Sequence, residues 1–324
     1  DAGLGGFQSL SHDGLLSWFA RRTGSGLDWD AYRFLLESEL TEAGQLRSTR
    51  FYPVFFLDLA RLGKTAQSSF HWPEFWSGGG DEPVVIMREG QNQTGSFFLA
   101  AKGGRAADNH GNMDAGSFIL ELDGVRWSLD PGNQNYHELE QLMGGGLWSS
   151  AQDSPRWTLL TKNSGGHSTL VINGDMHLAD ARAPLIRREL RGGLPQFTFD
   201  LSALYGDHIR KAHRSFSKLS ATRLRITDEL EFSPQTREVS WQMITRADVF
   251  EVDGGLKLQQ ENEDLYLRIP SGIPYEVKVI SLYPPPQPYD KQIEDLNRVE
   301  IIWKRDAFPG ESARLEVELD SNPF

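Results

Sequence analysis

The stretch "SFILELDGVRWSLD" (117–130) decides the fold class of this chain. Apolar and polar residues alternate on both sides of Asp123–Gly124, and a period of two is typical of a half-buried β-strand. An Asp-Gly pair between two such runs indicates a two-residue hairpin turn, because both central positions of that turn need a positive φ. The stretch therefore predicts two antiparallel strands.

Further strand signals follow toward the C-terminus. "STLVINGDMHL" (168–178) predicts a hairpin that turns at Asn173–Gly174, and "VFEVDGGLKLQQ" (249–260) predicts another at Asp253–Gly254–Gly255. Four more alternating runs complete the series: "LYLRI", "YEVKVISLY", "RVEIIWK" and "ARLEVEL". Many strands joined by tight turns, with no helices between them, predict an antiparallel sandwich or barrel.

Before about residue 76 the apolar residues recur close to helical spacing instead. Helices are predicted within "HDGLLSWFARR" (12–22), "DWDAYRFLLESEL" (28–40) and "STRFYPVFFLDLARLG" (48–63). Three short helices cannot close a large core alone, so we expect them to be the end of a larger helical array.

The Gly-rich connector "FWSGGGDEP" (75–83) separates the helical pattern from the strand pattern. It predicts an α+β multidomain chain with a helical segment over residues 1–80 and a large antiparallel β-sandwich over residues 81–324. Each part is read as a separate domain because the apolar period changes across the connector.

Composition disfavours several classes of protein. The formal net charge of −12 disfavours nucleic-acid binding but permits a local cationic cleft for an anionic substrate. No apolar run approaches the ~20 residues of a membrane helix, so we expect a soluble protein with no membrane partner. Without cysteine, any metal must be bound by His, Asp, Asn or Glu. The start "DAGLGGFQSL" has neither Met nor a signal peptide, as expected of a processed or truncated chain.

A concentration of polar side chains, "AADNHGNMDAGSF" (106–118), comes directly before the first strand of the hairpin. Alternate residues of an extended segment share a face, so His110 and Asn112 are expected on one side, and Asn109 and Met113 on the other. The segment is either a polar loop that joins two strands or one wall of an active site.

Two later residues are expected close to this segment. The hairpin turn is short, so Asp130 should return beside residues 112–116, and His167 opens the next strand. Polar groups from three strand ends can therefore converge on one rim of the sandwich. The spacing fits a functional His110 and also fits a hydrogen-bonded loop histidine.

The run "FFLAAKGGRAADNHGNMDAGSFILELDGVRWSLDPGNQNY" (97–136) resembles the opening of the C-terminal domain of the heparinase II/III family of polysaccharide lyases. The family pattern is a Gly-rich turn, Asn-His-x-His-x-Asp-x-x-Ser-Phe, a Gly-bearing hairpin, Asp-x-Gly and a Tyr. Other segments that match are "VVIMREG" (84–90), "GGHSTLVING" (165–174) and "HRSFSKLSATRLRITDELE" (213–231). The resemblance covers residues 84 to 260. It implies the C-terminal end of an (α/α) toroid followed by an antiparallel β-sandwich.

The resemblance implies β-elimination on a uronic-acid polysaccharide of glycosaminoglycan or alginate type. The substrate carboxylate must be neutralised, the C5 proton removed and the departing oxygen protonated. The sandwich histidine of the family matches His110, which would contact the carboxylate or assist proton transfer. Tyr136 either reaches the cleft as an auxiliary phenol or closes a hairpin through its hydroxyl. Arg88 and Asn109 are candidate substrate-binding residues, and for Arg88 a structural salt bridge is the alternative.

The resemblance also implies a metal in the sandwich, usually zinc. Its ligands in the family are the second His of the motif, the Asp after the hairpin and a later His, which become Asn112, Asp130 and His167. Asn112 departs from the pattern, since an amide oxygen is a poor zinc ligand but an acceptable calcium ligand. Without a metal, Asn112 and His167 can hydrogen-bond to Asp130, and in both cases the site braces the loop of His110.

A second departure concerns the toroid, whose catalytic Tyr has no match in residues 1–80. Tyr32 and Tyr52 lie in ordinary amphipathic patterns and are expected in the core. The chain is therefore expected to supply the sandwich half of an active site, with the N-terminal toroid part of the same protein as its partner. A periplasmic or secreted bacterial location is expected. The sequence leaves open whether the protein forms a homodimer. The alternative function is a carbohydrate-binding or structural sandwich that has lost lyase activity.

The remaining histidines and several tryptophans carry no motif. We expect the histidines at the surface or at caps: His12, His71, His137, His177, His208 and His213. Four tryptophans are candidates for stacking on sugar rings, with packing as the alternative: Trp72, Trp76, Trp148 and Trp157.

Overall fold

A computed structural model describes five stretches of the chain: residues 22, 73–89, 97–189, 195–270 and 272–323. The chain divides into two compact units, Asp1–Trp72 and Pro73–Phe324. The three predicted N-terminal helices lie outside the described residues, except for Arg22, which is helical. Two statements therefore stay predictions: that these helices end a toroid, and that a domain boundary falls at residue 80.

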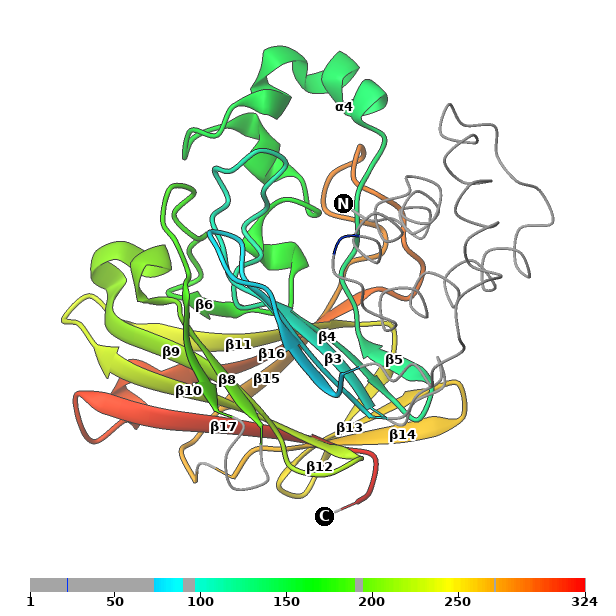
Figure 1. Ribbon diagram of the computed structural model, residues 1–324, viewed down its shortest axis with the longest axis vertical. Helices are drawn as coiled ribbons and strands as arrows, with labels where there is room; N and C mark the ends of the chain where they lie inside the picture. The colour runs from blue at the N-terminus through cyan, green and yellow to red at the C-terminus, as the bar shows by residue number, and fades with distance from the viewer. Residues whose placement is uncertain (1–21, 23–72, 90–96, 190–194, 271, 324) are drawn as a thin grey trace. The chain divides into compact units, whose positions relative to one another are not determined.

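The second unit consists mainly of three antiparallel sheets (Figure 1). The five-stranded sheet has the order β1 (Phe75–Ser77), β2 (Val84–Glu89), β3 (Phe97–Lys102), β4 (Phe118–Leu122) and β5 (Val125–Ser128). The eight-stranded sheet has the order β12 (Asp248–Val252), β13 (Gly255–Gln260), β14 (Glu263–Arg268), β17 (Ser312–Asp320), β10 (Arg223–Phe232), β9 (Ile209–Lys218), β8 (Gln196–Asp200) and β7 (Leu185–Glu189). The four-stranded sheet has the order β15 (Glu276–Ser281), β16 (Asn297–Lys304), β11 (Glu238–Thr245) and β6 (Leu170–Ile172).

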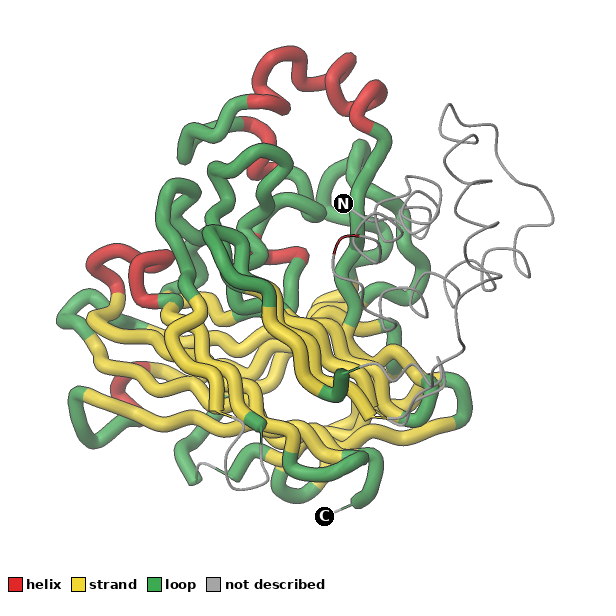
Figure 2. The backbone as a smooth tube through the Cα atoms, viewed as in Figure 1, coloured by secondary structure: helices red, strands yellow, loops and turns green. Residues whose placement is uncertain are grey.

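One apolar core joins the three sheets. Trp127 of β5, Phe216 of β9 and Trp241 of β11 belong to the same buried cluster, and none is more than 1% exposed. The strands supply this cluster through alternate residues, as the burial of β3 and β4 shows. Figure 2 shows the strands stacked at one end of the unit and the longer loops and most short helices gathered at the other. The predicted antiparallel sandwich is confirmed.

The hairpin that decided the fold class is present. Asp123 and Gly124 have φ values of 52° and 86° between β4 and β5, as the predicted turn requires. The hairpin of β12 and β13 turns at Asp253–Gly254, also as predicted.

The hairpin predicted over residues 168–178 is wrong. Asn173 does turn the chain, with a φ of 60°, but β6 pairs with β11 and no described strand returns beside it. The Asn173 side chain accepts hydrogen bonds from the backbone N–H groups of Arg237 and Glu238, 2.7 and 3.3 Å away. These bonds tie the turn to β11, and the residues that follow leave the sheet.

Short helices that the strand pattern did not predict lie between β5 and β6. They are α4 (Tyr136–Met143) and three 3₁₀ helices, η2 (Gly144–Trp148), η3 (Pro155–Thr158) and η4 (Ser164–Gly166). Asn135 caps α4 by accepting a hydrogen bond from the backbone N–H of His137, 3.1 Å away. Tyr136 therefore opens a helix and does not close a hairpin. None of the described helices is long and apolar enough to cross a membrane.

Two side chains expected near the surface are buried. His177 is 1% exposed, and its Nε2 donates to the carbonyl oxygen of Leu170, 3.0 Å away. Burial lowers the pKa of His177 to about 4, so it is neutral. Trp157 is 2% exposed and donates its indole N–H to the carbonyl of Ala151, so it packs in the protein and cannot stack on a ligand.

Candidate active site

A cavity of about 220 Å³ lies among the β3–β4 loop and the short helices between β5 and β6. Three segments enclose it: the loop between β3 and β4, the pair α4 and η2, and the segment from η3 toward β6. Its lining residues are Ala107, Asp108, Asn109, His110, Tyr136, Leu147, Trp148, Ser150, Arg156 and Lys162. Three of the sequence-predicted residues, Asn109, His110 and Tyr136, therefore face one cavity.

His110 projects from a tight turn of the β3–β4 loop, so the extended segment predicted here, with Asn109 and His110 on opposite sides, is wrong. Its φ of 61° lies in the left-handed region, and the Gly111 N–H donates to the Asp108 carbonyl, 2.8 Å away. A β-carbon on Gly111 would lie 2.5 Å from the carbonyl oxygen of Ala106, so the turn requires glycine there. The Arg105 Nε donates to Asp108 Oδ1 at 2.8 Å and closes the turn from the other side.

Two aromatic rings flank the imidazole. The Nδ1 atom of His110 lies 3.4 Å from Tyr136 Oη, with the two ring centroids 5.7 Å apart. The Trp148 ring meets His110 edge-on at 6.1 Å, and Trp148 is 47% exposed. Burial raises the pKa of Tyr136, so the phenol keeps its proton at neutral pH. The cavity thus presents an imidazole, a protonated phenol and an open indole face.

Two cations that the sequence did not single out form the inner part of the cavity. Lys162 is 1% exposed, and its Nζ donates to Tyr136 Oη at 3.3 Å and to Asn133 Oδ1 at 3.4 Å. Arg156 is 5% exposed, and its Nη2 donates to the Gly111 carbonyl at 2.6 Å. The only signal for Lys162 was its place in the otherwise uncharged run "WTLLTKNSGGH" (157–167).

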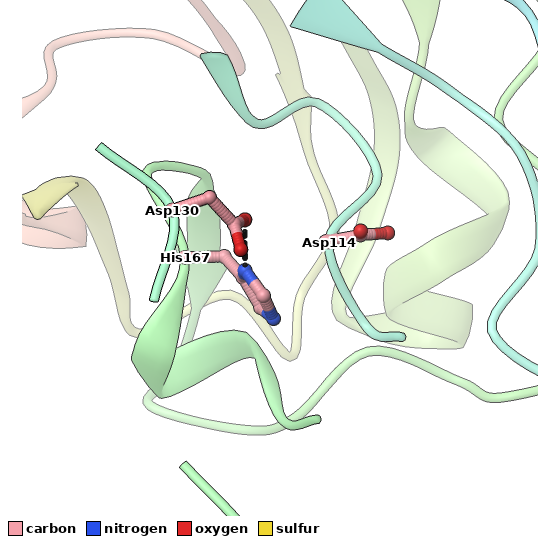
Figure 3. Close-up of side chains that lie close together, drawn as sticks. All are labelled: Asp114, Asp130 and His167. Atoms are coloured by element: carbon pink, nitrogen blue, oxygen red, sulfur yellow. Dashed lines mark hydrogen bonds and ion pairs between the residues drawn. The ribbon is translucent and has the colours of Figure 1, made fainter. Parts of the chain in front are cut away.

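Behind the loop, Asp114, Asp130 and His167 meet (Figure 3). One ligand atom from each lies within 4.8 Å of the others, so Asp130 returns beside the 112–116 segment as predicted. Asp130 Oδ2 lies 2.8 Å from His167 Nδ1. Burial opposes ionisation of Asp130, but the neighbouring His167 outweighs it and lowers the pKa of Asp130 to about 2. Asp114 is a member that the sequence prediction missed.

The residues present suit a cation ligand. His167 Nε2 and Asn112 Oδ1 are buried and have no hydrogen-bond partner among the described residues, which is uncommon for buried polar atoms. One imidazole, two carboxylates and one amide oxygen are metal-binding groups, with oxygen predominating. Asp114 is also held by Lys102, whose Nζ lies 2.8 Å from Asp114 Oδ1, so a metal would share this carboxylate with an ammonium.

Arg88 lies apart from the cavity. It sits on β2, opposite Phe98 of β3, and is not among the described residues that line the cavity. Burial lowers the pKa of Arg88. A contact between Arg88 and a substrate stays a prediction.

Residues 84–297 match a protein family described as Heparinase II/III-like, C-terminal. No sequence among functionally curated proteins matches the chain.

Solved structures of similar fold include a heparinase III, with a TM-score of 0.57, 16% identity, and coverage of 79% of this chain and 38% of that one. They also include heparan sulfate lyase HepC from Pedobacter heparinus, with a TM-score of 0.56, 12% identity, and coverage of 91% and 42%. At these identities the likeness shows the fold. The chain spans about two fifths of the length of these structures.

Proposed function

Because this chain belongs to the heparinase II/III-like family, whose members include polysaccharide lyases, we propose that it takes part in the β-elimination of a uronic-acid-containing polysaccharide. The observation that carries the proposal is the 3.4 Å approach of His110 Nδ1 to Tyr136 Oη at the wall of one cavity. The chain would supply the sandwich half of the active site. The substrate would be a glycosaminoglycan-like or alginate-like polymer or oligosaccharide.

The two side chains match the two proton transfers of the reaction. We assign His110 as the acceptor of the C5 proton, since an imidazole can hold or release a proton near neutral pH. We assign Tyr136 as the donor to the departing glycosidic oxygen, since burial keeps its phenol protonated. Lys162 donates to Tyr136 Oη and would stabilise the phenolate that remains after the transfer.

Other residues of the cavity suit a sugar chain. Trp148 offers an exposed indole face beside His110, on which a pyranose ring can stack. The Asn109 side chain lines the same cavity and can hydrogen-bond sugar hydroxyl groups. We propose that an N-terminal toroid part of the same protein completes the site and that the protein acts in the periplasm or outside the cell.

We further propose that Asn112, Asp130 and His167, with Asp114, hold a divalent cation. Three of these four groups offer oxygen, a set that favours calcium more than the zinc that the family resemblance implies. The ion would be structural and would tie the 112–116 segment to later strands. The residues themselves orient the turn of His110, whether through the ion or through the bond of His167 to Asp130.

One observation favours a second function. Asn112 stands where the family motif has a histidine, and a sandwich that had lost its chemistry would also bind sugars at Trp148. This alternative is a carbohydrate-binding domain without lyase activity.

The test is to incubate the full-length protein with glucuronate-containing glycosaminoglycans and with alginate. We expect products that absorb in the ultraviolet through a new carbon–carbon double bond, with a mass that shows no gain of water. Binding without any product would support the alternative function. Products that have gained water would show a hydrolase and contradict the proposal.

A further inference from the structure

The inner part of the cavity holds two buried positive charges close to each other. Arg156 and Lys162 are 5% and 1% exposed, and both line the cavity. Among the described residues, neither is within ion-pair distance of a carboxylate. Lys162 contacts a phenol and an amide, and Arg156 contacts the Gly111 carbonyl and the Trp157 ring.

This arrangement is electrostatically unfavourable when no anion is present. Burial and, to a lesser extent, the neighbouring charge of Arg156 together lower the pKa of Lys162 to about 8. The Nε of Arg156 is buried without a hydrogen-bond partner among the described residues. Buried charges are normally paired, because the desolvation cost is otherwise not offset. The cavity is therefore prepared to receive negative charge.

The carboxylates around the two cations are already engaged, and Asp130, which with Asp114 acts on Lys162 electrostatically, lies 2.8 Å from His167 Nδ1. Asp108 accepts from Arg105 at 2.8 Å and lies 3.9 Å from Arg182. Asp114 accepts from Lys102 at 2.8 Å. The positive charge of the inner cavity thus persists in a chain whose formal net charge is −12.

We propose that Arg156 and Lys162 form the binding site for the carboxylate of the uronate residue that loses its C5 proton, an inference that rests on the proposed function. Lys162 Nζ lies 3.3 Å from Tyr136 Oη, which lies 3.4 Å from His110 Nδ1. An anion on Lys162 is therefore adjacent to the proton-transfer pair. The uronate carboxylate is bonded to C5, the carbon that loses its proton, so a carboxylate on Lys162 places C5 near His110 and Tyr136. A sulfate group elsewhere on the sugar is not bonded to C5 and does not place it there.

Such a contact has a catalytic consequence. Negative charge flows from C5 into the carboxylate as the proton leaves, so a cation held at the carboxylate stabilises the transition state more than the bound substrate. The planar guanidinium of Arg156 matches the two oxygens of a carboxylate, and Lys162 adds a point charge.

The experiment measures equilibrium binding by calorimetry, with the full-length protein. The ligands are an unsulfated oligomannuronate and an unsulfated glucuronate-containing oligosaccharide, each beside its carboxyl-reduced form. The variants are Lys162→Met and Arg156→Gln, with Lys162→Arg to keep the charge. Lys278→Gln is the matched control, since Lys278 is exposed on the edge strand β15. Circular dichroism and thermal melting confirm that each variant is folded.

We expect Lys162→Met and Arg156→Gln to weaken binding of at least one uronate ligand by about 10- to 100-fold, as for loss of a hydrogen bond to a charged group. Lys162→Arg should retain most of the affinity, and Lys278→Gln all of it. The carboxyl-reduced form should bind weakly to the wild type and lose nothing further in the variants. Unchanged uronate binding by both Lys162→Met and Arg156→Gln, or no binding by the wild type, would overturn the inference.

Two further outcomes separate this inference from the proposed function. Carboxylate-dependent and Lys162-dependent binding without any unsaturated product would sustain the anion site and contradict the lyase. Unsaturated product formed with unchanged kinetics by Lys162→Met would sustain the lyase and contradict the anion site. A sulfated, carboxyl-reduced oligosaccharide that needs Lys162 for binding would show a sulfate site instead and would also overturn the inference.

Discussion

The Nδ1 atom of His110 lies 3.4 Å from the Oη atom of Tyr136, although 26 residues separate the two side chains in sequence. The β4–β5 hairpin returns the chain to this end of the sandwich, and α4 then begins at Tyr136. A left-handed turn points His110 toward the start of that helix. Two independent local structures therefore place the imidazole beside the phenol.

Substituting Tyr136→Phe should lower the rate of product formation by about 10²-fold or more, the usual contribution of a positioned acid or base. The aromatic contacts with His110 and Trp148 remain, so the thermal stability and the polymer affinity should change little. Steady-state kinetics separate kcat from KM. Tyr283→Phe is the control, since Tyr283 is an exposed tyrosine. A variant that keeps its full kcat would show that the hydroxyl takes no part.

The buried Lys162 predicts a specific dependence of stability on pH. Its pKa is about 8 in the folded protein, against 10.5 as the ordinary value. Between these values the unfolded chain binds a proton that the folded protein does not, so the free energy of unfolding rises with pH across this window. Between pH 8 and 10.5, the unfolding free energy of the wild type should therefore rise by roughly 3 kcal/mol relative to that of Lys162→Met.

The measurement is chemical denaturation of both proteins at several pH values. Below pH 8 Lys162 is charged in both the folded and the unfolded protein. The difference in unfolding free energy between the wild type and Lys162→Met should therefore not change with pH there, and Lys162→Met should be the more stable protein. A difference that stays constant up to pH 10.5 would show that Lys162 is not desolvated as the structure places it.

Calcium or zinc should raise the melting temperature of the wild-type protein if the cluster of Asp114, Asp130 and His167 holds a cation. At a metal concentration 100 times the Kd, binding to the folded protein alone adds about 2.7 kcal/mol to the free energy of unfolding. His167→Gln should abolish the increase. His213→Gln should not, because His213 pairs with Asp200 at 3.7 Å outside this cluster. Equal melting temperatures of the wild type with and without either metal would exclude the cation site.

The buried ion pair of Arg214 and Asp228 should dominate the stability of its region. The two residues face each other on β9 and β10, with Arg214 Nε and Nη2 both 2.8 Å from carboxylate oxygens. Arg214 also donates to the Gly116 carbonyl at 3.2 Å, which anchors the end of the β3–β4 loop. Asp228→Asn should cost about 3–5 kcal/mol of unfolding free energy, because it leaves a buried charge unpaired.

An exposed ion pair at the edge of the same region, between Arg210 of β9 and Glu311 just before β17, provides the comparison. Arg210 and Glu311 lie 3.0 Å apart and are 52% and 80% exposed. Arg210→Gln should cost no more than about 1 kcal/mol, because solvent screens the pair. Urea denaturation of both variants measures the contrast. Similar costs for Asp228→Asn and Arg210→Gln would contradict the assignment of a structural role to the buried pair.

Local turn chemistry made the strand hairpins predictable. Asp123–Gly124 and Asp253–Gly254 dictate their turns through the backbone conformation that those residues favour, so no tertiary information is needed. The partner of β6 could not be predicted in this way. Asn173 also turns the chain, but its side chain bonds to Arg237 and Glu238, more than 60 residues away.

The candidate site was predictable in part for the same reason. The hairpin geometry brings Asp130 back to the loop that precedes it, and motif resemblance pointed to His110 and His167. Lys162 is buried because η3 and α4 pack around it. The sequence signal for α4 is only the Asn135 cap, which is weak beside the strong strand patterns on either side. Asp114 occupies the Asp position of the family motif, but the motif alone does not show that its carboxylate lies beside Asp130 and His167.

The role of His110 is tested most directly by the rate at which full-length wild type and His110→Asn form unsaturated product from the polymer that the wild type cleaves. Asparagine suits this substitution because it tolerates the left-handed backbone at residue 110, where φ is 61°. We predict that the variant binds the polymer but forms product at least about 10²-fold more slowly. Product formation by His110→Asn at the wild-type rate would contradict a catalytic role for the imidazole.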